Sequence, residues 1–303
     1  MSEETTKLFE LEVELPNQLL TARSKRLVGF KPRYERLRQD LRLLIDVEGL
    51  AAWSEKHYGQ RVPLLDSLGD RYPLVVFHGD VGTGKSATAE CIANELAREM
   101  GKDATLFKMS TRVRGGGNVG EMSALINQAF DVVGKTAGRA KLSILIIDEA
   151  DSLATSRTAK QSHHEDKVAV NTLIQKIDDV RRYTGRVLVF LCTNHFEALD
   201  PAIVRRAAYN EKFVRPNDVE RAELFDLDCR GLNLDPALVA ELVALTGPNG
   251  ARTLGFTYSD IRTRLLPEAL GLAYPSRAIT GDDLMKALSC IQPSPAIAHI
   301  GET

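Results

Sequence analysis

The residues best suited to chemistry form one glycine-rich stretch. Residues 79–86 read GDVGTGKS, which matches the pattern G-x-x-x-x-G-K-[ST]. A strand-like apolar segment, LVVFH, precedes it, and a segment with helical periodicity, KSATAECIANELAREM, begins within it. In this context the backbone N–H groups of the loop surround phosphate groups at the start of the helix. The sequence therefore predicts a nucleotide-binding loop formed by Gly79, Asp80, Val81, Gly82, Thr83, Gly84, Lys85, Ser86 and Ala87.

Two side chains of this loop have separate expected roles. Lys85 is expected to reach the β- and γ-phosphates, and the hydroxyl group of Ser86 is expected to ligate Mg²⁺. The predicted ligands are therefore ATP and Mg²⁺.

A pair of acids supplies the groups that hydrolysis requires. Residues 144–149 read ILIIDE, in which four apolar residues predict a buried strand and the acids follow at its carboxyl end. Ligands bind at that end of the strands in open α/β sheets. Asp148 is expected to hold Mg²⁺ through water, and Glu149 to polarise the attacking water as a general base. A chain that only sensed nucleotide would not need Glu149, so the pair favours an enzyme.

A polar residue ends the next apolar strand. Residues 186–194 read RVLVFLCTN, and Asn194 emerges beside the acidic pair in the expected sheet. Its amide group can donate to the γ-phosphate or orient the water. We therefore include Asn194 among the candidate catalytic residues.

The rest of the chain predicts an α/β domain followed by helices. Strand-like segments without polar alternation, at 74–79, 104–110, 142–149, 186–194 and 211–215, are mostly separated by helical patterns, which indicates a parallel sheet covered on both faces. After Pro216 the remaining segments predict a small helical domain. We divide the chain into an N-terminal extension (1–24) with an alternating strand at 8–15, a large domain (25–215) and a helical lid (216–303).

Composition excludes several classes of protein. Lys and Arg total 39 against 41 Asp and Glu, a net charge of −2, which argues against nucleic acid as an obligate partner. The four cysteines form no CxxC pair, which favours a reducing compartment over a disulfide framework or a zinc site. The N-terminus lacks the pattern of a signal peptide, and no segment approaches the length of a membrane span. We expect a cytoplasmic protein with no membrane partner.

The order of these motifs resembles that of the AAA+ ATPases. The nucleotide-binding loop, DEADSL (148–153), TNHFEALDPAIVRR (193–206) and a helical lid follow one another as they do in that family. Within it, the long polar loop after DEADSL, the helix ending QKIDDVRR, and SDIRTRLLPEAL (259–270) resemble the pachytene checkpoint ATPases, which remodel HORMA-domain proteins. The resemblance implies an AAA+ fold with a five-stranded parallel sheet and a C-terminal helical lid, assembled as a ring, expected to be a hexamer.

The resemblance also assigns residues that the motifs alone do not. It implies an arginine finger that reaches the γ-phosphate in the neighbouring subunit, at either Arg205 or Arg206, while the other arginine braces the interface. Val28, Gly29 and Phe30 correspond to the linker near the adenine. In the lid, the position of the sensor-2 arginine falls on Ile261, so Arg262 beside it is the candidate.

The stretch STRVRGGGNVGE (110–121) corresponds to the loop that faces the central pore of AAA+ rings. Alignment on Gly120 places Asn118 and Val119 where an aromatic and an aliphatic residue usually grip the substrate chain, so the aromatic is missing. Arg112 and Arg114 would make the rim of the pore basic and favour an acidic tail of the substrate.

The resemblance implies an ATP-driven remodeller of a HORMA-domain partner. The absence of a large N-terminal domain is typical of short bacterial members, which are associated with nucleotidyltransferase-based defence against phage. Two alternatives remain at this point. One is an AAA+ ATPase acting on DNA or a sliding clamp, supported only by the basic run at 22–42, which otherwise predicts a solvated helix face. The other is a nucleotide-dependent scaffold, which the intact catalytic set disfavours.

Overall fold

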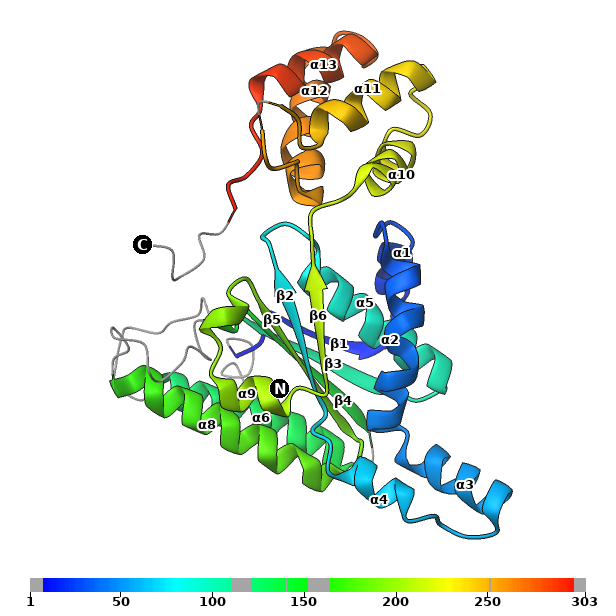
Figure 1. Ribbon diagram of the computed structural model, residues 1–303, viewed down its shortest axis with the longest axis vertical. Helices are drawn as coiled ribbons and strands as arrows, with labels where there is room; N and C mark the ends of the chain where they lie inside the picture. The colour runs from blue at the N-terminus through cyan, green and yellow to red at the C-terminus, as the bar shows by residue number, and fades with distance from the viewer. Residues whose placement is uncertain (1–7, 111–120, 140, 152–163, 251, 297–303) are drawn as a thin grey trace.

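A twisted sheet flanked by helices forms the body of the molecule, and a cluster of helices lies beyond one end of it (Figure 1). The structure is a computed structural model that describes residues 8–110, 121–139, 141–151, 164–250 and 252–296. Among the helices of these residues, none is both long and apolar enough to cross a membrane.

The sheet has six strands in the order β1-β3-β4-β5-β2-β6. Their bounds are β1 Leu11–Leu15, β2 Leu74–Gly79, β3 Ala104–Ser110, β4 Leu142–Asp148, β5 Val187–Thr193 and β6 Tyr209–Phe213. The five strands from β2 to β6 pair in parallel, whereas β1 pairs antiparallel with β3. The predicted five-stranded parallel sheet is confirmed, and the alternating segment near the N-terminus adds a sixth strand at its edge.

The register of the strands brings the predicted site residues to one edge of the sheet. Ser110 pairs with Asp148, and His78, which precedes the nucleotide-binding loop, pairs with Thr193. Of these strands, β2, β4 and β5 are apolar through their middles and almost fully buried, so burial on both faces fixes the register. The polar residues can therefore emerge only at the strand ends.

Helices cover both faces of the sheet. One face packs on α6 (Glu121–Gly138), α8 (His164–Val180) and α9 (Pro201–Arg206), and the other on α1 (Gln18–Ser24), α2 (Phe30–Ile45) and α5 (Lys85–Met100). Two shorter helices, α3 (Val47–Tyr58) and α4 (Leu64–Gly69), connect α2 to β2 and extend from the end of the sheet that carries the amino ends of the strands (Figure 1).

The remaining helices build the lid around a core of their own. They are α10 (Asp218–Asp228), α11 (Pro236–Thr246), the π-helix η4 (Asp260–Leu265), α12 (Leu266–Ala273) and α13 (Gly281–Cys290). Their apolar residues form a cluster separate from the two that flank the sheet. Val28 belongs to the lid cluster and Phe30 to a cluster of the sheet, so the segment between them spans both units. This arrangement supports the division at residue 215, which stays a prediction.

The N-terminal segment packs into the large domain. Leu15 and Leu20 lie in the core beside α5, and the side chain of Asn94 on α5 joins the two ends of the turn into α1. Its Oδ1 accepts from the N–H of Asn17 at 2.6 Å, and its Nδ2 donates to Thr21 Oγ1 at 2.9 Å. Since Asn94 is 0% exposed, water cannot replace these contacts.

Replacing Asn94 should therefore destabilise the whole large domain. Asn94→Leu leaves the Asn17 N–H and the Thr21 hydroxyl without their partner, and we expect a loss of about 1–3 kcal/mol in the free energy of unfolding. Urea denaturation measures it. Glu12→Ala, on the exposed side of β1, is the control and should stay within about 0.5 kcal/mol of the wild type. Equal stability of Asn94→Leu and the control would mean that the segment packs only loosely.

Candidate active site

The predicted nucleotide-binding loop lies between β2 and α5 and needs glycine at two tight positions. Gly79 has φ of 129°, and a Cβ atom there would lie 2.0 Å from the carbonyl oxygen of Phe213 on β6. Gly82 has φ of 71°, and a Cβ atom there would lie 2.8 Å from Thr257 Oγ1 in the lid. Both positive φ values are costly for other residues. The loop therefore fits closely between the sheet and the lid.

Lys85 is buried at the start of α5 and closes the loop on itself. Its Nζ donates to the carbonyl oxygens of Gly79 at 2.9 Å and Asp80 at 2.8 Å. Burial lowers the pKa of Lys85, and the nearby carboxylates of Asp148 and Asp80 partly oppose that effect. A phosphate group would give this ammonium group an anionic partner in place of two neutral carbonyls, and such charge-assisted contacts are stronger.

The acid at the end of β4 is oriented by two contacts. Asp148 Oδ1 accepts from the N–H of Glu149 at 3.0 Å, and Oδ2 lies 3.4 Å from Lys108 Nζ. The same ammonium group lies 3.1 Å from Glu90 Oε1 on α5. Burial alone would lower the pKa of Lys108, but the two carboxylates outweigh it and the pKa is raised, so Lys108 stays charged. Its contacts fix the plane of the Asp148 carboxylate.

Lys108 was not predicted from the sequence. The only signal available was a lone lysine in the strand segment ATLFKMS, and a lysine at a strand position is depleted but not rare. Its partners lie on two other elements, so nothing near it in the chain identifies its role.

Glu149 has a left-handed backbone conformation, which is unusual for a residue other than glycine. Its φ is 52°, in the left-handed region that costs a residue other than glycine about 1 kcal/mol or more. The strand ends there, and the next N–H, that of Ala150, donates to the Cys192 carbonyl oxygen of β5 at 2.9 Å. Such strain concentrates at functional sites, which agrees with the role proposed for Glu149.

Asn194 is held at the end of β5 by Asp151, an acid that follows Asp148 and Glu149 in the chain. Asp151 Oδ1 accepts from Thr193 Oγ1 at 2.8 Å and from the N–H of Asn194 at 3.3 Å. The N–H of His195 in turn donates to Thr193 Oγ1 at 3.0 Å. Asp151 thus joins the ends of β4 and β5, a role that the sequence analysis missed although the residue lies in the DEADSL motif.

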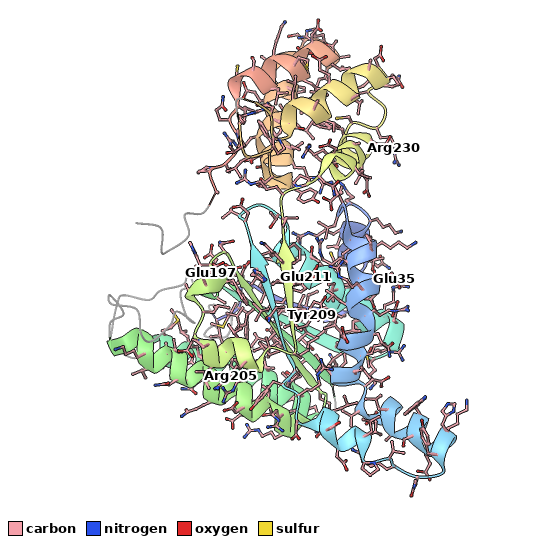
Figure 2. All side chains as sticks on the ribbon, viewed as in Figure 1. Glu35, Glu197, Arg205, Tyr209, Glu211 and Arg230 are labelled. Atoms are coloured by element: carbon pink, nitrogen blue, oxygen red, sulfur yellow. The ribbon has the colours of Figure 1, made fainter. Side chains whose placement is uncertain are left out.

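The two candidate finger arginines differ in their surroundings. Arg206 makes a two-pronged ion pair with Asp178 on α8, at 2.6 and 3.0 Å, and donates to the Ala202 carbonyl oxygen. Arg205 is exposed near the end of α9 and forms no ion pair with any residue that the structure describes (Figure 2). Of the two candidates, Arg205 is therefore the one whose guanidinium group is not committed to an ion pair with the described residues.

The candidate sensor-2 arginine binds within the lid and its linker. Arg262 pairs with Asp228 on α10, at 2.5 Å, and donates to the carbonyl oxygen of Arg26 at 2.7 Å. The lid meets the nucleotide-binding loop instead through the N–H of Ser259, which donates to the Gly82 carbonyl oxygen at 3.1 Å. In this structure Arg262 joins α10 to the N-terminal linker, and its role toward nucleotide stays a prediction.

The proposed pore residues lie outside the described part of the chain. They are Arg112, Arg114, Asn118, Val119 and Gly120. The strand that leads to them ends at Ser110, which pairs with Asp148.

The described residues fit a magnesium nucleoside triphosphate. The glycine-rich backbone leaves room for phosphate oxygens, Lys85 supplies a buried cation, and the hydroxyl of Ser86 and the carboxylate of Asp148 are ligands of the kind that Mg²⁺ prefers. The N-terminus of the 16-residue helix α5 adds the favourable end of its dipole.

Comparison with known proteins identifies relatives over the full length. Residues 75–216 match the model of the ATPase family associated with various cellular activities (AAA). The chain is 49% identical over 296 residues to CD-NTase-associated protein 6 of Escherichia coli strain KTE188. The alignment covers 97% of this chain and 99% of that protein.

Solved structures also match nearly the whole chain. A chain of the E. coli MS115-1 HORMA:CdnC:Trip13 complex superposes with a TM-score of 0.88 at 38% identity, covering 98% of this chain and 100% of that chain. The Rhizobiales Trip13 structure matches with a TM-score of 0.71 at 30% identity, covering 95% and 99%.

The roles of Glu149 and Lys85 can be separated by two substitutions. Glu149→Gln should bind ATP but hydrolyse it at least about 100-fold more slowly, because the general base is lost. Lys85→Ala should instead lose nucleotide affinity, because the buried cation that faces the phosphates is removed. Titration with a fluorescent ATP analogue and a phosphate-release assay measure the two effects.

Glu197→Gln is the matched control, since Glu197 follows Asn194 by three residues but has no proposed part in catalysis (Figure 2). Hydrolysis by Glu149→Gln at the wild-type rate would disprove the role of Glu149.

Proposed function

The chain belongs to the AAA ATPases, in the family of CD-NTase-associated protein 6, and from that membership we propose that it uses ATP to remodel a HORMA-domain protein. The observation that carries this proposal is the likeness, across nearly the whole chain, to a protein of a HORMA:CdnC:Trip13 complex. Because the likeness includes both the ATPase core and the lid, it extends beyond the nucleotide site that all AAA proteins share.

The arrangement of the site supports hydrolysis by in-line attack of water on the γ-phosphate. Lys85 holds the β- and γ-phosphates, while Ser86 and Asp148 are placed to hold Mg²⁺, which would neutralise charge on the phosphate oxygens. Glu149 accepts a proton from the attacking water, and Asn194 orients that water from the neighbouring strand end. Asp151 and Lys108 act indirectly, because they fix Asn194 and Asp148.

Arg205 is proposed to complete the site of the neighbouring subunit. It is exposed, whereas Arg206 is occupied by Asp178 and is proposed to brace α9 against α8. A finger supplied by another subunit requires a closed ring, and we propose a hexamer. In such a ring each interface between subunits would contain one active site.

Substrate contact is proposed for the segment that follows β3. Val119 would wedge between side chains of an extended peptide, and Arg112 and Arg114 would favour an acidic tail. A loop without an aromatic grips weakly, which suits brief local unfolding of a partner better than continuous threading.

The cellular role is proposed from the same relatives. The E. coli relative is named for its association with a CD-NTase, which supports a bacterial nucleotidyltransferase-based defence against phage. A cytoplasmic location is part of this proposal.

The alternative of a DNA-directed enzyme loses its main support. It relied on the basic run at 22–42, but the arginines of that run form ion pairs within the protein. Those in ion pairs are Arg23, Arg26, Arg33, Arg36, Arg38 and Arg42. Glu211 on β6, for example, pairs with both Arg33 and Arg36 of α2 (Figure 2). Neutralised side chains contribute little to binding phosphate backbones.

Mixed rings test the arginine finger. Arg205→Ala should lower hydrolysis by about 1,000-fold, and mixing it with Lys85→Ala subunits, which keep their fingers, should restore part of the activity. Phosphate release at increasing protein concentration, with light scattering for assembly, measures this. Arg206→Ala serves as the comparison and should lower stability more than it lowers the rate per ring. Full activity of a monomer would exclude a finger in trans.

Disassembly of a partner tests the function itself. With a HORMA-domain protein from the same genome in complex with its binding partner, ATP should release the partner, and Glu149→Gln should not release it. Val119→Asp should lose disassembly while retaining most of its hydrolysis, since the segment lies after β3 and outside the hydrolytic residues. Size-exclusion chromatography measures release. The proposal is wrong if the wild type hydrolyses ATP and yet no HORMA complex dissociates.

A further inference from the structure

The nucleotide-binding loop contains an acid close to the expected phosphates. Asp80 is its second residue, and its side chain is 18% exposed. Its negative charge makes the loop less attractive to an anion, and it partly opposes the burial that lowers the pKa of the neighbouring Lys85. The Asp80 carbonyl oxygen accepts from Lys85 Nζ at 2.8 Å, and its Oδ1 accepts from the Val81 N–H at 3.0 Å. A carboxylate at this position needs a counter-charge if the loop is to accept a triphosphate.

Arg215 supplies that counter-charge from the segment between β6 and the lid. Its Nε lies 2.6 Å from Asp80 Oδ2, and its side chain is only 10% exposed. Its Nη1 donates to the carbonyl oxygen of Gly255 in the lid at 2.7 Å. One planar guanidinium group therefore joins the nucleotide-binding loop to the backbone of the lid. Arg215 itself lies in the segment that leads from β6 to α10, which Figure 1 shows as a single connection between the sheet and the lid.

The third nitrogen of this guanidinium group has no partner. Nη2 of Arg215 is buried and donates to no polar atom of the described residues. A buried donor without a partner is costly, so the position of Arg215 is maintained by what its other two nitrogens bind. Asp80, Arg215 and Gly255 also line a cavity of about 620 Å³ between the carboxyl ends of β2, β5 and β6 and the lid.

The bridge begins at Asp80, whose contact with Lys85 would change when nucleotide binds. Lys85 now donates to the carbonyl oxygens of Gly79 and Asp80, and a phosphate that attracts Lys85 would remove that donor from both. The second contact between loop and lid, from Ser259 to Gly82, lies two residues further along the loop. The contacts from Asp80 through Arg215 to Gly255 therefore connect the loop to the lid separately from Ser259.

We propose that Arg215 is a positioning residue that neutralises Asp80, so that the loop accepts a triphosphate, and that links the loop to the lid through Gly255. The proposal rests on nucleotide binding by an AAA ATPase and not on the HORMA partner. A failure to find a partner would leave it standing, and the measurements below need no hydrolysis.

Nucleotide affinity tests the first function. We expect Arg215→Met to weaken ADP binding, measured by calorimetry in EDTA, by about 10- to 100-fold, because Asp80 is left unpaired beside the phosphates. Asp80→Asn removes the charge itself, so the double variant Arg215→Met/Asp80→Asn should bind ADP within about threefold of Asp80→Asn alone. If the double variant binds as weakly as Arg215→Met, the charge of Asp80 is not what Arg215 controls and the proposal is wrong.

Lid orientation tests the second function. Spin labels on the exposed Cys290 of α13 and on Lys56→Cys of α3 report the distance between lid and sheet, and the cysteines Cys91, Cys192 and Cys229 are buried. We expect ADP to shift this distance in the wild type and not in the double variant, although the double variant still binds ADP. Arg215→Lys keeps the charge but lacks the two-pronged geometry, so it should retain affinity and lose the shift. A shift that persists in both variants would overturn the link to the lid.

Arg277→Met is the matched control. Arg277 pairs with Asp283 in the lid, with Nη2 2.6 Å from Oδ1, and touches no residue of the nucleotide-binding loop. Loss of this ion pair should lower the thermal stability of the lid but leave both the ADP affinity and the distance shift within error of the wild type. If Arg277→Met weakens ADP binding as much as Arg215→Met does, the effect is general loss of lid stability and the proposal is wrong.

Discussion

The close approach of β2 and β6 at Gly79 is the constraint on which the rest of the structure depends. A side chain at Gly79 would occupy the space of the Phe213 carbonyl oxygen, so the two strands can pair to their last residues only because glycine stands there. That pairing brings the chain that leaves β6 directly to the nucleotide-binding loop. The lid therefore begins beside the nucleotide-binding loop, and its contacts with the loop follow from a backbone requirement.

The same edge of the sheet gathers charges of both signs within a few ångströms. Lys85 and Lys108 lie among the carboxylates of Asp80, Asp148 and Glu90, with Glu90 paired in turn with Arg23 of α1. Lys108 pairs with Glu90 and Asp148, whereas Lys85 is held by two carbonyl oxygens with carboxylates nearby. The site therefore depends on residues that never touch substrate. The N-terminal segment takes part in this network, which gives it a role beyond extending the sheet.

The lid differs from the sheet in how it is held. The sheet is fixed by continuous apolar burial, whereas the lid meets the nucleotide-binding loop through the hydrogen bond from Ser259 to Gly82 and through Arg215, which pairs with Asp80 and donates to Gly255. Directional contacts can be exchanged at little cost, and packed apolar cores cannot. The sheet is therefore the rigid part of the molecule, and the contacts between the loop and the lid are the part that is easier to exchange.

The sequence by itself determined the fold class, the nucleotide-binding loop and the order of the catalytic strands. Each of these depends on residues that are close together in the chain: glycine spacing for the loop, unbroken apolar runs for the parallel strands, and Asp148 and Glu149 directly after one of them. Such patterns act through local backbone geometry and burial, which a single sequence displays.

Only the tertiary structure decided which charged residues form ion pairs with one another. Arg215 and Asp80 are separated by 135 positions, and Lys108 meets Asp148 and Glu90 from a third element. The same holds for the two finger candidates, Arg205 and Arg206. They are adjacent in the sequence, and only the ion pair of Arg206 with Asp178 distinguishes them. Ion pairing acts through space and is indifferent to separation along the chain, so a charged residue gives no sign in the sequence of which partner the fold will bring to it.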